Sequence, residues 1–149
     1  MKEMGMNKLA TIGYETDTQG GMINRLKAAE VELVVDVRAV ASSRKAGFSK
    51  TLLGNSLKAE GIDYLHLRPL GTPKPGREAA RAGRIDEMRR IFDAHLEEPE
   101  AQLALAQATE LASQKRIALL CYEDDANCCH RQIVAQRIRE RLKCEVVDL

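Results

Sequence analysis

The stretch RIALLCYEDDANCCHRQIVAQRIRERL, residues 116–142, indicates the fold class of this chain. It begins with a mainly apolar run, residues 116–122, of the kind found in strands that are buried on both faces. A polar loop follows, and residues 128–142 then carry apolar side chains at helical spacing. This order of buried strand, loop and amphipathic helix is typical of α/β domains with a parallel sheet.

The same alternation continues on both sides of this stretch. Strands are predicted at residues 9–14, 32–38, 62–68, 116–122 and 144–149. Helices are predicted at residues 18–29, between Ser49 and Gly61, and at 84–97, 100–114 and 128–142, with loops at 39–48 and 69–76. Helices between strands imply right-handed crossovers. We therefore expect one α/β domain over residues 1–149, with a three-layer, Rossmann-like architecture and a mainly parallel sheet of about five strands.

Composition is that of a globular protein, with 44% apolar and 30% charged residues in 149. The chain has no stretch of 18 apolar residues, and its N-terminal residues do not resemble a signal peptide, so we expect a cytoplasmic protein that does not span a membrane. Three of the four cysteines lie within nine residues, Cys121 to Cys129. This crowding argues against a disulfide framework and favours thiol chemistry or metal binding.

Charge is unevenly distributed along the chain. Residues 38–90 carry twelve basic and five acidic side chains, although the net charge of the whole chain is only +1. A basic region in a nearly neutral protein suits a small anionic ligand, and a solvated charged surface is the alternative interpretation. Nucleic acid is a possible but less favoured partner, because only 3% of the residues are aromatic and stacking on bases needs aromatic side chains.

Candidate site residues follow from the sheet. Ligands of parallel α/β sheets bind beyond the carboxyl ends of the strands. Polar or reactive residues at the predicted strand ends are Tyr14, Asp36, Arg38, Cys121 and Glu123.

The start of the last helix suggests an anion site. Asn127 is a favourable N-cap, which would leave the amides of the next three residues free to bind an anion. Arg131 would add a bidentate partner for phosphate or carboxylate. A thiol in this first turn should have a lowered pKa, and the helix dipole should lower the pKa of His130 as well.

Three interpretations of this segment compete. The first is a catalytic or anion-binding site that uses Cys129, His130 and Arg131. The second is a zinc site formed by some of the three clustered cysteines and His130, although adjacent residues at a helix start are expected to point in divergent directions. The third is that the cysteines are buried core residues. The residues call for no cofactor.

Several pieces of the chain resemble one known family. They are TIGYE (11–15), VVDVR (34–38) with Ser42-Ser43-Arg44 after it, GIDYLHLRPLG (61–71) and LLCYEDDANCCHR (119–131). Together they resemble the DUF488 family, and the last piece is similar to its Cys-x-Glu…Cys-His-Arg signature. The resemblance implies a shared set with Asp36 and Arg38 beside it: Cys121, Glu123, Cys129, His130 and Arg131. The chain departs from many relatives at Tyr14-Glu15, where they carry His-Ser.

The leading hypothesis is an enzyme or binding domain for a phosphorylated or other anionic ligand, nucleotide-like ligands included. Cys129 would be the nucleophile or redox thiol, and Glu123 or His130 the acid or base. The ligand-binding residues would be Arg131, Arg38, Asp36, Tyr14, Ser42 and Cys121. The alternatives are a non-catalytic nucleic-acid-binding module and a thiol sensor or zinc site, so the residues leave open whether the protein is an enzyme. Five arginines are expected to form a solvated helix face or, alternatively, a lid over an anionic substrate: Arg77, Arg81, Arg84, Arg89 and Arg90.

Overall fold

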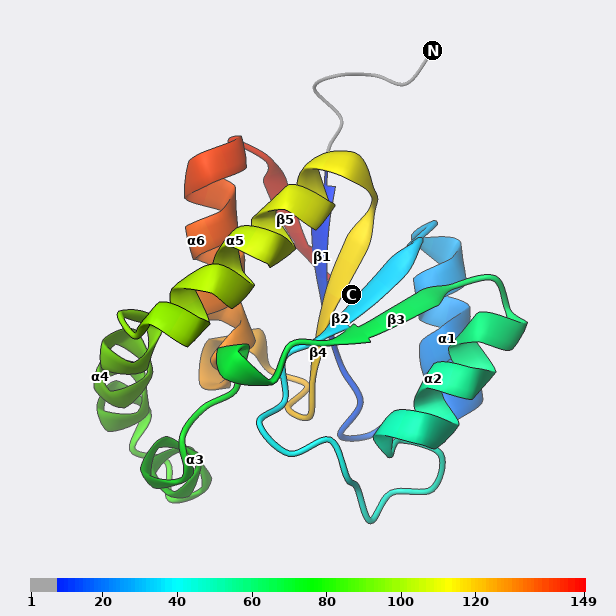
Figure 1. Ribbon diagram of the computed structural model, residues 1–149. Coiled ribbons are helices and arrows are strands. Elements are labelled where there is room, and N and C mark those ends of the chain that lie inside the picture. The colour runs from blue at the N-terminus through cyan, green and yellow to red at the C-terminus, as the bar shows by residue number, and fades with distance from the viewer. Residues whose placement is uncertain (1–7) are drawn as a thin grey trace.

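The fold is an α/β sandwich with five parallel strands, as the computed structural model of residues 8–149 shows (Figure 1). The strands are β1 (Lys8–Gly13), β2 (Leu33–Asp36), β3 (Asp63–His66), β4 (Ile117–Cys121) and β5 (Glu145–Asp148). The helices are α1 (Gln19–Ala28), α2 (Lys50–Ala59), α3 (Lys74–Arg81), α4 (Ile85–Leu96), α5 (Pro99–Gln114) and α6 (Arg131–Leu142). The predicted fold class is confirmed. Residues 1–7 lie outside the described residues; they include the start of the predicted domain and of the N-terminal segment that does not resemble a signal peptide.

Helices cover both faces of the sheet and bury two separate cores. Helices α1 and α2 lie on one face, and α4, α5 and α6 lie on the other (Figure 1). Successive side chains of β4 alternate between the two cores, because a strand points consecutive residues to opposite faces. Leu120 packs with α1 and α2, whereas Leu119 and Cys121 pack on the side of α4, α5 and α6.

The strand order places three strand ends side by side. The order is β3-β2-β4-β1-β5, so β4 fills the gap between β2 and β1. In register, Gly13 of β1 lies beside Cys121 of β4, and Asp36 of β2 lies beside Leu120. All neighbouring pairs are parallel, so the segments that follow β1, β2 and β4 emerge at one edge. This edge is where ligands of such sheets bind.

One helix was missed by the sequence prediction. Residues 69–76 were expected to be a loop because prolines and glycines gather there. The structure instead has a short 3-10 turn, Arg68–Leu70, and then α3, which starts at Lys74. Pro75 lies in the first turn of α3, where a proline costs no hydrogen bond, so it begins the helix and does not break it. No helix within residues 8–149 has the length and apolar character needed to cross a membrane.

Candidate functional site

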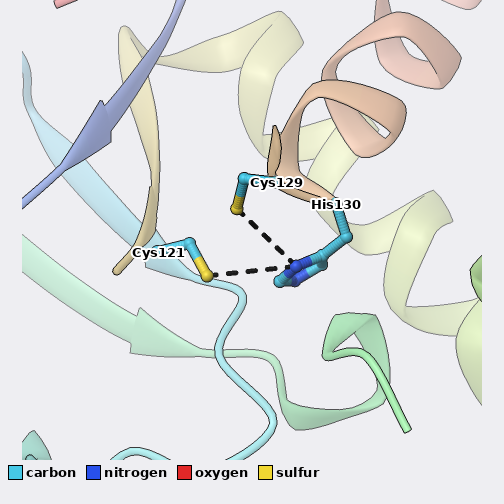
Figure 2. Close-up of side chains that lie close together, drawn as sticks. All are labelled: Cys121, Cys129 and His130. Carbon is cyan, nitrogen blue, oxygen red and sulfur yellow. Dashed lines mark hydrogen bonds between the residues drawn. The ribbon is translucent and has the colours of Figure 1, made fainter. Parts of the chain in front are cut away.

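Two thiols and an imidazole converge at the carboxyl edge of the sheet (Figure 2). Cys121 ends β4, whereas Cys129 and His130 lie in the turn just before α6. The His130 Nδ1 atom lies 3.9 Å from Cys121 Sγ and 3.8 Å from Cys129 Sγ. All three residues are buried, and their ligand atoms lie within 4.8 Å of one another. We call these three residues the Cys-Cys-His cluster.

The ring of His130 is held in one orientation. Its Nε2 lies 2.7 Å from the carbonyl oxygen of Val37, just after β2. A carbonyl can only accept, so Nε2 carries a proton, and in the neutral ring Nδ1 is then an acceptor facing the two sulfurs. Phe92 of α4 packs edge-on against the ring, with centroids 5.0 Å apart. The backbone of one strand end and a core aromatic thus direct the reactive nitrogen toward the thiols.

The cluster separates the acidities of its two thiols. Burial alone would raise the pKa of Cys129, but the proton shared from Cys121 and the charges of His130 and Arg131 hold it well below the ordinary value. The pKa of Cys121 is raised well above its ordinary value by its hydrogen bond to Cys129 and by burial. Burial opposes a charge on His130, yet the Cys129 thiolate raises the pKa of the ring. The lowered pKa of Cys129 agrees in direction with the sequence prediction, although its cause is the neighbouring side chains and not a helix start. The lowered pKa expected for His130 is wrong, because the charge of Cys129 and its hydrogen bond outweigh the effect of burial.

Glu123 stands beside this cluster. Its Oε1 lies 3.7 Å from Cys121 Sγ. Burial, followed by the charge of Cys129, raises the pKa of Glu123 to about 7, so the carboxyl group can gain or lose a proton near neutral pH.

The backbone of the Glu123 loop is tightly held. The fully buried Arg131 donates to the carbonyl oxygens of Glu123 and Asp124. The same loop lies against β1, where a Cβ on Gly13 would come within 1.9 Å of the Glu123 carbonyl oxygen. Glycine at this position and the guanidinium of Arg131 together set the height of the loop above the sheet.

A cavity of about 410 Å³ opens over the cluster. The buried Cys-Cys-His cluster and the half-buried Glu123 form part of its lining. Its walls come from the segments that follow β1 and β2, from the turn before α6 and from α3, which lies below the strand ends (Figure 1). Tyr14, Ser42 and Thr72 add hydroxyl groups to the lining.

The cavity lining is strongly basic. It contains Arg38, Arg44, Arg77 and Arg81, against Glu123 as its one acidic residue. Arg44 and Arg81 are exposed and make no hydrogen bond or ion pair with another residue of the described chain. Arg77 is half-buried, and one of its terminal nitrogens donates to the carbonyl oxygen of Thr72. Three guanidinium groups therefore retain donors for a ligand.

Arg38 differs because it is committed to the protein. Its Nε and Nη2 donate to the carboxylate of Asp36, at 2.7 Å for the shortest contact, and Nη1 donates to Tyr14 Oη and to the Phe48 carbonyl. Four of its five N–H groups are thus used, which leaves one on Nη2. Asp36 is fully buried and also accepts from Tyr64 Oη. Because Asp36 neutralises its charge, Arg38 contributes mainly this one remaining N–H donor to the cavity wall.

The amino-acid sequence matches the model of one protein family over most of its length. The family model described as "Domain of unknown function DUF488" matches residues 20–138, most of the chain. The chain belongs to the DUF488 family. Neither the curated proteins nor the solved structures contain a match to it.

The residues predicted for the site divide into two groups in space. Cys121, Glu123, Cys129 and His130 line the cavity together, and so do three further residues predicted for the site: Tyr14, Arg38 and Ser42. Asp36 and Arg131 do not line it. Asp36 lies behind Arg38, and Arg131 lies beneath the Glu123 loop, where its Nε has no hydrogen-bond partner among the described residues. Both residues position other groups at the site.

The predicted helix start needs correction. Asn127 is not an N-cap; it lies in a 3-10 turn, Ala126–Cys128, whose cap is the side chain of Asp125. The amides of Cys128 and Cys129 bond to the backbone of this turn, and α6 begins only at Arg131. The expected row of free amides is therefore absent from the first turn. The turn has a different effect, because it brings Cys129 and His130 round to face Cys121 (Figure 2).

Three arginines of the cavity lining are not among the site residues predicted from the sequence. Arg44 follows Ser42 and Ser43, whereas Arg77 and Arg81 lie on α3. The sequence predicts a solvated helix face for these two, with a lid over an anionic substrate as the alternative. The signal that could have identified them is the excess of basic residues in 38–90. The Val37 carbonyl, which orients His130, had no signal in the sequence.

Proposed function

We propose that the cavity binds a small anionic ligand, a phosphate ester or a carboxylate, with its reactive end against the Cys-Cys-His cluster. The observation that carries this proposal is the charge of the lining, in which Arg44, Arg77 and Arg81 retain free donors and, of the described residues, only Glu123 is acidic. A concave site lined by one sign of charge concentrates ions of the opposite sign. Guanidinium groups are also suited to bidentate contact with phosphate and carboxylate.

The size of the cavity supports a small molecule. A volume of about 410 Å³ falls within the range of about 300–1,000 Å³ that is typical of small-molecule pockets. A nucleotide-like ligand is compatible with this volume, and the exposed ring of Tyr122 at the edge offers an apolar surface. An extended nucleic acid is less favoured as the ligand, because binding it requires a long basic groove with several aromatic side chains, and only 3% of the residues are aromatic.

The inner end of the cavity supplies the reactive groups. Thiols, an imidazole and a carboxyl group that can exchange a proton near neutral pH are the groups that nucleophilic or metal-assisted chemistry uses. Cys129 as nucleophile, and His130 or Glu123 as acid or base, stay predictions. Arg44, Arg77 and Arg81 take over the ligand-binding role that the sequence assigned to Arg131, because they line the cavity and Arg131 does not.

Charge-selective alkylation tests the proposal. Chelator-treated protein is reacted with anionic iodoacetate or neutral iodoacetamide, and mass spectrometry measures the label on Cys129. The rate with iodoacetate divided by the rate with iodoacetamide should be at least about tenfold higher for Cys129 than for free cysteine, because the positive field of the cavity concentrates the anion. The ratio should fall as salt is added. Inorganic pyrophosphate is a suitable competing anion, because the experiment then does not require the natural ligand. It should protect Cys129 from alkylation.

Matched arginine variants assign the effect to the cavity. Arg77→Ala and Arg81→Ala should each lower the iodoacetate preference. Arg90→Ala removes the same charge from an exposed position of α4 outside the cavity lining, and it should leave the ratio unchanged. A wild-type ratio equal to that of free cysteine, or equal losses in all three variants, would contradict an anion site.

A further inference from the structure

We propose that the Cys-Cys-His cluster is a zinc site with three protein ligands, Cys121 Sγ, Cys129 Sγ and His130 Nδ1, and a fourth coordination position open to the cavity. Two cysteines and one histidine are donors that zinc binds in proteins. The ligands come from two segments, the end of β4 and the turn before α6, which the fold brings together.

The spacing of the three atoms fits a coordination tetrahedron. Zinc lies about 2.3 Å from sulfur and about 2.0–2.1 Å from nitrogen, so a tetrahedral site separates a sulfur from a nitrogen by about 3.5–3.6 Å. The two sulfur-to-Nδ1 distances here are 3.8 and 3.9 Å. These two distances exceed the tetrahedral value by only a few tenths of an ångström, and the two sulfurs lie within 4.8 Å of each other. Small changes in side-chain torsions can close such gaps. The sequence analysis expects adjacent residues at a helix start to point in divergent directions, which would argue against zinc. Cys129 and His130 instead lie in a turn before α6, and both face Cys121.

The surroundings of His130 suit a metal ligand. A histidine that binds a metal usually donates its other ring N–H to a carboxylate or a backbone carbonyl, which fixes the coordinating nitrogen. The Val37 carbonyl oxygen, 2.7 Å from Nε2, provides that acceptor. The three side chains are nearly closed to solvent, with residue exposures of 6%, 3% and 6% for Cys121, Cys129 and His130.

The open position follows from what lies beside the cluster. Glu123 approaches Cys121 Sγ but does not belong to the group whose atoms all lie within 4.8 Å, so it stands next to the ion and does not complete the tetrahedron. All three ligands line the cavity. A water molecule or an oxygen of the bound anion would take the fourth place, as in zinc sites that keep one exchangeable position. This last assignment, unlike the site itself, rests on the proposed function.

Cobalt titration of the whole chain tests the site. Co²⁺ is added to chelator-treated, reduced protein, because its absorption reports both geometry and thiolate ligation. We expect one equivalent to produce the visible bands of a tetrahedral ion and a near-ultraviolet thiolate-to-cobalt band. Zn²⁺ should abolish both, since it binds such sites more tightly than Co²⁺. X-ray absorption of the zinc form should resolve two sulfur neighbours.

Variants separate this cluster from adventitious binding. Cys121→Ser and Cys129→Ser should each weaken the thiolate-to-cobalt band by about half. Each should also lower the affinity for Co²⁺ by more than about 100-fold, because loss of a residue that only supports a ligand already costs about 10–100-fold. Cys128→Ser changes the adjacent thiol, which lies outside the cluster, and should leave stoichiometry and spectrum unchanged. Circular dichroism of each variant checks that it is folded.

The outcomes distinguish the two proposals. Absence of tetrahedral cobalt binding, or binding that depends on Cys128 and survives loss of Cys121, overturns the zinc site. Iodoacetate preference and pyrophosphate protection of Cys129 in the chelated protein then still support the anion cavity. Cobalt binding without any anion preference would retain the metal site and remove the proposed ligand class.

Discussion

The change Asp36→Asn should destabilise the protein strongly, because it leaves the buried Arg38 without its counter-ion. The side chains of Asp36 and Arg38 are 0% and 5% exposed, and the closest nitrogen and oxygen are 2.7 Å apart. Both carboxylate oxygens accept hydrogen bonds, one from the backbone and Nε of Arg38 and the other from Nη2 of Arg38 and from Tyr64. The asparagine side chain has one oxygen and one NH₂ group. In either orientation, its NH₂ group would therefore face groups that also donate hydrogen bonds.

The expected loss follows from the burial of the pair. Removal of one partner of a buried ion pair costs about 3–5 kcal/mol, because the remaining charge stays desolvated. In a domain of this size about 1 kcal/mol corresponds to about 2–4 °C in Tm, so the melting temperature should fall by about 6–20 °C. Urea unfolding followed by circular dichroism gives the free energy directly, with an unchanged slope if the two-state transition is retained.

A matched control lies on the neighbouring strand. Asp63 of β3 also pairs with a cation, Lys115, but at 3.5 Å and with its side chain 68% exposed. Asp63→Asn should change the free energy of unfolding by less than about 0.5 kcal/mol, because exposed pairs contribute little. The reasoning is refuted if Asp36→Asn loses less than about 1 kcal/mol or no more than this control.

Two further predictions concern the loop and the buried tyrosine. Gly13→Ala should cost at least about 1–3 kcal/mol in urea unfolding, because the new methyl group meets the Glu123 carbonyl oxygen. Gly20→Ala, in the first turn of α1 with no atom within 4 Å of the added group, should be neutral or stabilising; equal losses would exclude the clash as the cause. Burial and the charge of Asp36 raise the pKa of Tyr64, so stability should fall as the pH rises above about 10, the ordinary value for tyrosine. Tyr64→Phe should lack that alkaline loss, and identical pH profiles of unfolding would contradict the shift.

The sequence by itself determined the fold class and most of the reactive set. Mainly apolar runs such as residues 116–122 indicate strands buried on both faces. Parallel sheets contain such strands because helices cover both of their faces. The reactive residues could be selected because Cys121, Glu123, Cys129 and His130 lie within ten residues at the end of one such strand. Patterns of this kind are local, so they can be recognised without knowing the strand order.

Tertiary structure decided how those residues work together. The contact between His130 and the Val37 carbonyl joins positions 93 residues apart, and it exists only because β4 inserts beside β2. Arg131 has the residue type of an anion ligand, yet packing turns it toward the Glu123 loop, whereas Arg77 and Arg81 reach the cavity through the unexpected helix α3. The direction of a side chain depends on which neighbours satisfy its hydrogen bonds and exclude water, and those neighbours come from distant parts of the chain.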